Sequence, residues 1–383
     1  MSRLTLFHVG FLFLILFFTT TAKAQKEAET FNVDSTLYEY YQRCQEYLLE
    51  PVVLNMSDTL FRMAGERQDE RMQAVAIATQ LDYYYFQGTN EDSVIHYTNK
   101  VKEFAKATHQ PKYYYFAWAN RLITYYLKTS RTNIALYEVQ NMLKEAQEED
   151  DKTGLSRCYN IMSQIYTIKR FDSMAFEWRL KEIELTEKYK IENYNISQTY
   201  AQIANYYINQ KKQKEALAAV EKAIATANSS TQQISAKLEF VNYYSKFGDF
   251  QAAEKLLKEC QAAFEQDKRL ESIKKRLYNI ECLYYQQTKQ YQKALEAAKM
   301  QEKEERRLSE SILSSIHYRT QGEIYQKMGN MNLAVKYLQM YINTDDSLKI
   351  ANEQVSSSEF ATLLNVETVS YTHLRAHETL RHL

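Results

Sequence analysis

The side chains that most often carry catalysis are few in this chain and lie far apart. Before the last fifteen residues the histidines are His8, His96, His109 and His317, and their spacing matches no metal site. No nucleophile elbow, phosphate-binding loop or HExxH sequence is present. The acidic run 148–151 falls between expected helices, where carboxylates lack the shielded pocket that acid–base catalysis needs. We therefore predict no catalytic residue, no metal site and no cofactor, and we interpret the protein as a non-enzyme.

The cysteines give no redox or metal motif either. Cys44, Cys158, Cys260 and Cys282 form no CxxC pair, and four cysteines over 383 residues do not make a disulfide framework. We interpret them as buried thiols that act as small apolar residues. A disulfide between Cys260 and Cys282 is the alternative, because the helices that carry them should be neighbours.

Composition favours long helices joined by short connections. The chain has only 7 Gly and 2 Pro but 32 Tyr, so turn residues are scarce while one large amphipathic residue is used many times. The formal net charge is zero and no basic stripe is present. This segment therefore has no electrostatic footprint for nucleic acid or for an anionic membrane surface.

A tyrosine followed nine residues later by a small residue recurs seven times, in steps of 37 to 42 residues. The pairs are Tyr84–Ser93, Tyr126–Ala135, Tyr166–Ala175, Tyr207–Ala216, Tyr244–Ala253, Tyr285–Ala294 and Tyr325–Ala334. Regular recurrence on this scale is typical of an array of helical repeats. We expect the tyrosine on the first helix of each hairpin and the small residue on the second.

The spacing within one unit has a physical reason. Apolar residues around Tyr207 and after Ala216 recur every three or four positions, which gives each of two helices one apolar side. A small residue is needed at the point where two antiparallel helices cross. Gly88, Gly248 and Gly329 lie in the turns, where a left-handed helix end favours glycine.

The pattern resembles the tetratricopeptide repeat (TPR), most clearly over Tyr318, Gly322, Tyr325, Gly329 and Ala334. The resemblance implies an all-α fold, a TPR-like α-solenoid in which helical hairpins form a right-handed superhelix. It covers residues 70–345 as seven units, with a degenerate unit or cap at 25–69. The units exceed the usual length of about 34 residues and lack its closing proline, so the curvature of the groove does not carry over.

The resemblance also implies a concave groove lined by the first helices, which would bind a protein or peptide. An amide-rich groove suits recognition of an extended backbone. Some side chains of the tyrosine runs 83–85 and 113–115 are expected to be packing residues and others rigid anchors in the groove. The candidate groove residues are Gln164, Asn205, Asn242, Asn279, Lys128, Lys246 and Lys327.

The N-terminus predicts export. Residues 1–24 combine a basic start at Arg3, an apolar run from Leu4 to Phe18 and small residues at Ala22 and Ala24. This is the pattern of a secretory signal peptide cleaved after Ala24, with an uncleaved anchor as the alternative. We expect the protein to be exported. The resemblance to sensor regions described in the next paragraph implies that it is periplasmic.

The C-terminus predicts a continuation that is missing. Residues 346–367 have the spacing of an amphipathic exit helix, whereas 368–383 resemble a translated transposase sequencing adapter. We therefore expect the natural chain to continue after about Glu367. A signal peptide, a Tyr-rich array and an exit helix together resemble the periplasmic sensor regions of bacterial membrane histidine kinases. That resemblance implies a truncated two-component sensor attached to the membrane through the missing part, and a stand-alone exported adaptor for envelope complexes is the alternative.

Overall fold

The computed structural model describes residues 33–88, 90–191, 193, 195–307 and 315–347, together with 349 and 356. All regular secondary structure in these residues is helical, and the fold is a TPR-like α-solenoid, which confirms the predicted fold class. The predicted signal peptide, most of the exit helix and the adapter-like tail lie outside the described residues.

The chain divides into two compact units, the first ending at Glu145 and the second beginning at Ala146, so that the boundary falls within α8. The first unit holds α2 (Ser35–Glu46), α3 (Val52–Glu66), α4 (Glu70–Gln87), α5 (Glu91–Ala107), α6 (Pro111–Tyr115), the π-helical η1 (Phe116–Ile123), α7 (Thr124–Lys128) and most of α8 (Thr132–Glu148). The sequence gives no signal of this division.

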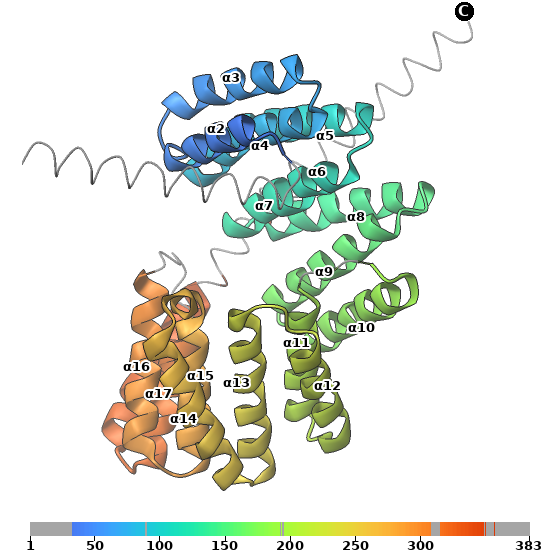
Figure 1. Ribbon diagram of the computed structural model, residues 1–383. Coiled ribbons are helices and arrows are strands. Elements are labelled where there is room, and N and C mark those ends of the chain that lie inside the picture. The colour runs from blue at the N-terminus through green and yellow to red at the C-terminus, as the bar shows by residue number, and fades with distance from the viewer. Residues whose placement is uncertain are drawn as a thin grey trace, which may run out of the picture. The chain divides into compact units, whose positions relative to one another are not determined.

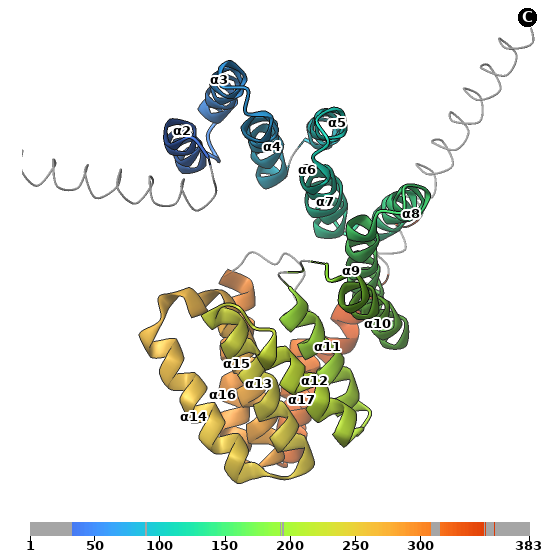
Figure 2. The ribbon, with the colours of Figure 1, turned by 45° about the vertical axis from the view of Figure 1, so that its right-hand side comes forward.

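The second unit is a succession of helical hairpins, stacked in sequence order (Figure 1). It consists of α9 (Lys152–Ile168), α10 (Asp172–Tyr189), α11 (Ile196–Asn209), α12 (Gln213–Ala225), α13 (Ser230–Phe247), α14 (Phe250–Gln266), the 3₁₀-helical η2 (Lys268–Ile273), α15 (Lys274–Gln287), α16 (Tyr291–Arg307), α17 (Ile316–Lys327) and a last helical segment over 331–347. The first helices α11, α13 and α15 pack directly on one another (Figure 2).

Short polar residues begin many of these helices. The side chains of Asp69, Asn90, Asp151, Ser229 and Asp249 each accept a hydrogen bond from a backbone N–H of the following first turn. Such caps satisfy donors that would otherwise have no partner at a helix end, and each typically stabilises a helix by about 1 kcal/mol. Local sequence thus sets where the helices begin.

The repeated tyrosines lie at the end of the first helix of each hairpin. In six of them the backbone oxygen accepts a hydrogen bond from the N–H five residues later, as in Lys212 to Tyr207, whereas Tyr84 accepts from Gly88. Tyr126 and Tyr325 are buried and the other five are half-buried. In all seven hairpins the residue four positions after the tyrosine has a positive φ, and after Tyr84 this residue is Gly88.

The turn glycines are therefore placed as predicted, but the same backbone is also formed without glycine. Gly88, Gly248 and Gly329 have φ of 68°, 92° and 77°. Four further turns place a residue with a side chain there, namely Ser130, Arg170, Lys211 and Lys289. A side chain in this left-handed region costs about 1–2 kcal/mol, so these four turns are strained.

The small residues lie where the two helices of a hairpin cross. The six alanines at these positions are at most 2% exposed (Ala135, Ala175, Ala216, Ala253, Ala294 and Ala334). The predicted pairing of Tyr84 with Ser93 is wrong by one residue, because Ser93 is half-buried and Val94 is fully buried. The reason is a longer turn: Val94 donates its N–H to Asn90, six residues after Tyr84, whereas the equivalent acceptor for Ala135 is Arg131, five residues after Tyr126.

Candidate functional site

A continuous set of polar side chains runs across the first helices of the second unit, and we name it the polar face. On the three helices that carry several members, neighbouring members lie three, four or seven positions apart, which places them on one side of the helix. The polar face consists of Gln202, Asn205 and Asn209 on α11, Glu239, Asn242 and Lys246 on α13, Arg276, Asn279 and Gln286 on α15, and Lys327 on α17.

The centre of the polar face is the buried carboxylate of Glu239, which is 3% exposed. Arg276 donates from Nη2 to its Oε1 at 2.6 Å. Asn205 and Asn242 donate to its Oε2 at 3.5 and 3.4 Å, near the long limit for a hydrogen bond. One side chain of α13 is thus bonded to both neighbouring first helices.

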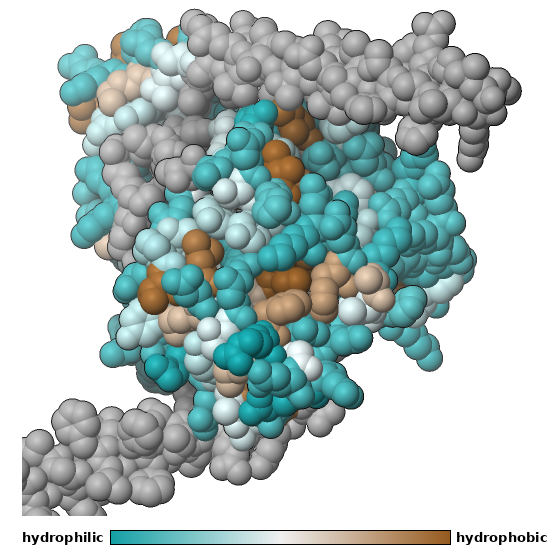
Figure 3. Space-filling view, turned by 90° about the horizontal axis from the view of Figure 1, so that it is seen from above, coloured by the Kyte–Doolittle hydropathy of each residue, from teal (hydrophilic) through white to brown (hydrophobic). Residues whose placement is uncertain are grey.

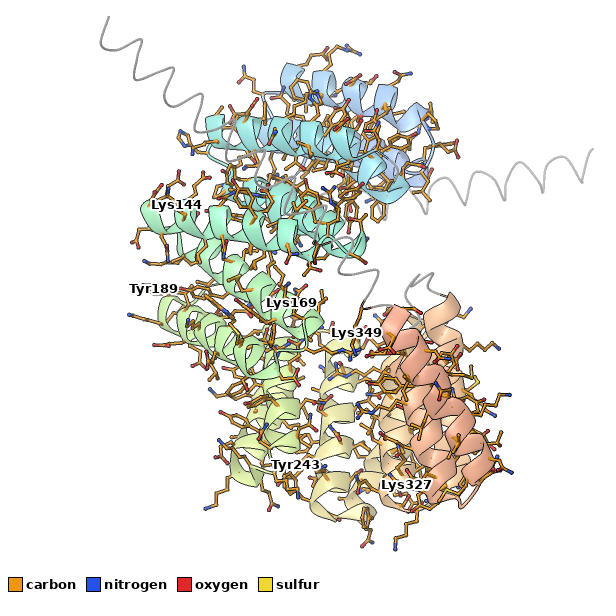
Figure 4. All side chains as sticks on the ribbon, turned by 180° about the vertical axis from the view of Figure 1, so that it is seen from behind. Lys144, Lys169, Tyr189, Tyr243, Lys327 and Lys349 are labelled. Carbon is orange, nitrogen blue, oxygen red and sulfur yellow. The ribbon has the colours of Figure 1, made fainter. Side chains whose placement is uncertain are left out.

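Further hydrogen bonds extend this arrangement to the next helices. Asn209 donates to Asn205 Oδ1 at 2.9 Å within α11, and Arg179 of α10 donates from Nε to Gln202 Oε1 at 2.8 Å. Lys327, labelled at the end of α17 in Figure 4, donates to Gln286 Oε1 of α15 at 3.1 Å. Hydrogen bonds thus connect the polar face to α10 and join its members on α15 and α17.

The predicted groove residues fall into different settings. Asn205, Asn242 and Lys327 bond within the polar face, and Lys246 and Asn279 are exposed on it. Glu239 and Arg276, which hold the centre together, are not among the residues predicted from the sequence. A signal existed, because Glu239 precedes Asn242 by three residues and Arg276 precedes Asn279 by three, so each shares a helix side with a predicted residue.

Gln164 is linked through hydrogen bonds to a second buried carboxylate, that of Glu182, and not to the carboxylate of Glu239. It is exposed on α9 and donates to Asn160 Oδ1 at 2.6 Å. Asn160 donates in turn to Glu182 of α10 at 3.2 Å, and Asn193 donates to the same carboxylate at 2.9 Å. Glu182 is 1% exposed, and burial raises its pKa although these hydrogen bonds oppose the shift.

Lys128 belongs to the first unit, where it meets aromatic rings. Its Nζ lies 4.2 Å from the centroid of the Tyr85 ring and 5.7 Å from that of Phe86. The Arg121 guanidinium also lies over Tyr85, at 4.8 Å, and forms an ion pair with Asp82. Lys128 is thus part of a cation–aromatic cluster and not of the amide-rich face.

A small hollow opens beside Arg276, between the N-terminal parts of α11, α13 and α15. Its volume is about 110 Å³. Polar side chains and two alanines line it, together with Ile273 of η2 (Ser197, Gln198, Ala201, Thr231, Gln232, Ser235, Ala236 and Arg276). The polar face therefore has a recess large enough for a small side chain.

The remaining observations on the described residues concern possible metal ligands, membrane spans and apolar surface. Among them, no group of three His, Cys, Asp or Glu side chains is gathered closely enough for a metal ion, and no helix is long and apolar enough to cross a membrane. His96 and His109 are exposed and His317 is buried. In the space-filling view of Figure 3, apolar surface forms separate patches on a mostly hydrophilic face.

The interpretation of the cysteines as buried thiols is confirmed. All four are free and at most 2% exposed, so the alternative of a bridge between Cys260 and Cys282 is not formed. Burial raises the pKa of Cys44 to about 11 and that of Cys158 to about 12. A protonated thiol is a poor nucleophile, so these side chains suit packing rather than redox chemistry.

No protein-family model and no curated protein sequence matches the chain. Among solved structures it is similar to the apo form of the quorum sensor NprR from B. thuringiensis, with 13% identity, a TM-score of 0.53, and coverage of 84% of this chain and 91% of that chain. It is also similar to a Rap protein complexed with competence and sporulation factor (15% identity, TM-score 0.49, covering 86% and 92%) and to the type IV pilus biogenesis factor PilW (19%, 0.38, 58% and 90%). These neighbours are helical repeat proteins of the TPR type. At 13% identity, the likeness to NprR shows the fold alone.

Proposed function

We propose that this chain is a non-catalytic scaffold that binds an extended protein or peptide segment along the polar face. The observation that carries the proposal is the set of side-chain amides on α11, α13 and α15, of which Asn205 and Asn242 donate to the buried Glu239 carboxylate. An amide both donates and accepts hydrogen bonds, so it matches the alternating N–H and C=O groups of a peptide backbone.

The spacing of the helices supports an extended ligand. Packed helices lie about 8–10 Å apart, and an extended chain advances about 3.3–3.6 Å per residue. About one ligand residue in three would therefore meet a new helix of the polar face. Since Arg276 neutralises Glu239, the centre of the face favours backbone hydrogen bonds over attraction of a strongly charged ligand.

We further propose that the bound state is transmitted along the second unit, as in the sensor part of a membrane signalling protein. Repeats contact only their neighbours, so a ligand that bridges several of them would favour one curvature. Arg170, in the turn between α9 and α10, lies 3.4 Å from Asp345 of the last helical segment, and Asp345 also accepts from Ser315 at 3.1 Å. In Figure 4 the labels Lys169 and Lys349 mark the two segments that this ion pair joins. A change of curvature would therefore act on the segment that leads into the predicted exit helix.

The cellular setting within this proposal is the periplasm. It is supported by the signal-peptide pattern of residues 1–24 and by the resemblance of the array to periplasmic sensor regions. Sequencing the reading frame beyond Glu367 in uncontaminated DNA tests it. A membrane span followed by a kinase supports the sensor assignment, whereas a stop codon soon after Leu364 supports the stand-alone adaptor.

Peptide binding is tested by selecting a random peptide library displayed on phage against the purified chain. The enriched peptides are then titrated calorimetrically into the wild type and into Asn205→Ala and Asn242→Ala. We expect each substitution to weaken binding by about tenfold, the effect of one lost net hydrogen bond of about 1.4 kcal/mol. Gln213→Ala, at an exposed amide on the second helix α12, is the matched control and should bind normally.

Thermal melting of each variant shows that the fold is intact, which matters most for Asn242 because it is 8% exposed. The proposal is wrong if no peptide is enriched. It is also wrong if the enriched peptides bind the two asparagine variants as tightly as the wild type.

A further inference from the structure

The hollow beside Arg276 has more hydrogen-bonding capacity than the protein uses. The Arg276 guanidinium makes one hydrogen bond, from Nη2 to Glu239, within the described part of the chain. Its Nε is buried and has no partner among the described residues. A guanidinium has five N–H groups, and buried polar atoms are nearly always paired, so an underused one in the wall of a recess points to a missing acceptor.

Residues with hydroxyl groups line the same hollow as Arg276. Thr231 and Ser235 of α13 line it and are half-buried, and no hydrogen bond of either hydroxyl occurs within the described residues. Ser197 Oγ donates to the Ala223 carbonyl at 2.7 Å, which leaves its oxygen able to accept. The recess thus offers donors from the guanidinium and acceptors from hydroxyl oxygens.

We propose that this hollow binds the side-chain amide of an asparagine in the bound peptide. The inference rests on the proposed peptide-binding function and names one side chain that the polar face selects. The carbonyl oxygen would accept from the Arg276 guanidinium, and the NH₂ group would donate to the hydroxyl oxygens of Ser235 and Thr231.

Volume and charge select this side chain over others. A cavity of about 150 Å³ binds benzene, so a hollow of about 110 Å³ suits a group of about four non-hydrogen atoms, which is the size of an asparagine side chain. Aromatic and long basic side chains are too large. Aspartate has the right size, but its carboxylate would add a second negative charge to the guanidinium that already pairs with the buried Glu239.

The test uses blocked five-residue peptides of the form Ac-Ala-Ala-Xaa-Ala-Ala-NH₂, with Asn, Asp, Leu or Lys at the central position. The peptides are titrated into the purified ¹⁵N-labelled chain, and the arginine Nε–H signals are followed by NMR. We expect the Asn peptide to shift the Arg276 signal in a saturable way and the Asp peptide to bind at least about tenfold more weakly. Arg276→Lys, which keeps the charge next to Glu239, assigns the signal by its loss.

Calorimetry of further variants gives a second measurement of binding that does not depend on the Arg276 NMR signal. Calorimetric binding of the Asn peptide should weaken about tenfold or more in Arg276→Lys and be lost in Ser235→Leu, whose side chain fills the hollow. Arg62→Lys, at a 67% exposed arginine of the first unit, is the matched control and should bind normally. Melting curves verify that each variant is folded.

The outcomes separate this inference from the proposed function. Equal binding of the Asn and Asp peptides, or normal binding by Arg276→Lys, overturns the inference. Stronger shifts of the Arg276 signal by N-acetylglucosamine than by any peptide overturn it as well. If library peptides bind in a manner that depends on Asn205 and Asn242 but leave the Arg276 signal unchanged, the function stands and the inference fails. If the Asn peptide fills the hollow while library peptides bind Asn205→Ala and Asn242→Ala as tightly as the wild type, the inference about the hollow stands and the proposed role of the polar face fails.

Discussion

Breaking the ion pair between Glu239 and Arg276 should destabilise the second unit strongly. The side chain of Glu239 is 4% exposed and that of Arg276 is 25% exposed. In Arg276→Met the carboxylate stays buried but loses its counter-charge. Removal of one partner of a buried pair typically costs about 3–5 kcal/mol, and because a quarter of Arg276 is open to water we expect the lower end, about 3 kcal/mol.

The double variant Glu239→Gln/Arg276→Met distinguishes this reasoning from a simple loss of packing. A buried pair replaced by neutral groups of similar volume is often neutral in stability, so the double variant should lie within about 1 kcal/mol of the wild type. Glu239→Gln alone should cost about 1 kcal/mol, because the partly exposed Arg276 can turn toward water. The single losses sum to about 4 kcal/mol, so a double variant that loses at most about 1 kcal/mol gives a coupling energy of about 3–4 kcal/mol in magnitude.

Urea unfolding followed by far-UV circular dichroism measures these free energies. Because arrays of repeats can unfold in parts, hydrogen exchange of the amides in α11, α13 and α15 should be measured on the same variants. The reasoning is refuted if Arg276→Met loses less than about 1 kcal/mol, or if the double variant loses the sum of the single losses.

Three further predictions concern the hairpins and the thiols. Ala216 is 0% exposed at a helix crossing, so Ala216→Glu buries a charge and should unfold α11 and α12 locally. The control Ala218→Glu changes an exposed residue and should melt within about 2 °C of the wild type, and equal melting temperatures of the two variants would contradict the helix register. Glycine suits a positive φ better than a residue with a side chain, so Lys211→Gly, at φ 58°, should raise the free energy of unfolding by about 0.5–1 kcal/mol and Gly248→Ala, at φ 92°, should lower it by about 1 kcal/mol. The opposite order of urea midpoints would contradict the left-handed backbone conformation of these turns. Burial raises the cysteine pKa values above the ordinary 9.0, so the thiols of the native protein should react slowly with Ellman's reagent at pH 8, and rapid labelling would contradict this. Because only the unfolded state loses these protons near pH 9, the free energy of unfolding should fall as the pH rises above about 9.

The hairpins could be predicted because their determinants are local and repeated. The alanine at each crossing and the tyrosine at each first-helix end face similar neighbours in successive units, so a fixed spacing of nine residues appears in the sequence. The same regularity explains the error at Ser93. The turn after Tyr84 is one residue longer, and a spacing rule cannot register a single added residue in one unit.

The hydrogen-bond partners at the centre of the polar face could not be predicted because they are far apart in the sequence. Asn205 and Arg276 reach Glu239 from positions 34 and 37 residues away, and the sequence around Glu239 does not reveal that its carboxylate is buried. The resemblance to the TPR pointed to the correct surface through Asn205, Asn242 and Asn279, and the spacing of three residues before Asn242 and Asn279 is the one local signal for Glu239 and Arg276. The boundary within α8 is likewise set by contacts and not by a change in composition.

Stability alone does not account for the polar face, and this favours recognition as its role. Apolar residues in place of a buried ion pair often hold helices together at least as well, and the amides of Asn205 and Asn242 add further polar groups where leucine or alanine would pack. The Glu239→Gln/Arg276→Met variant can therefore separate the two roles. If this variant is as stable as the wild type but no longer binds the selected peptides, the polar groups serve binding. If it binds the peptides as tightly as the wild type, the polar groups have no role in binding.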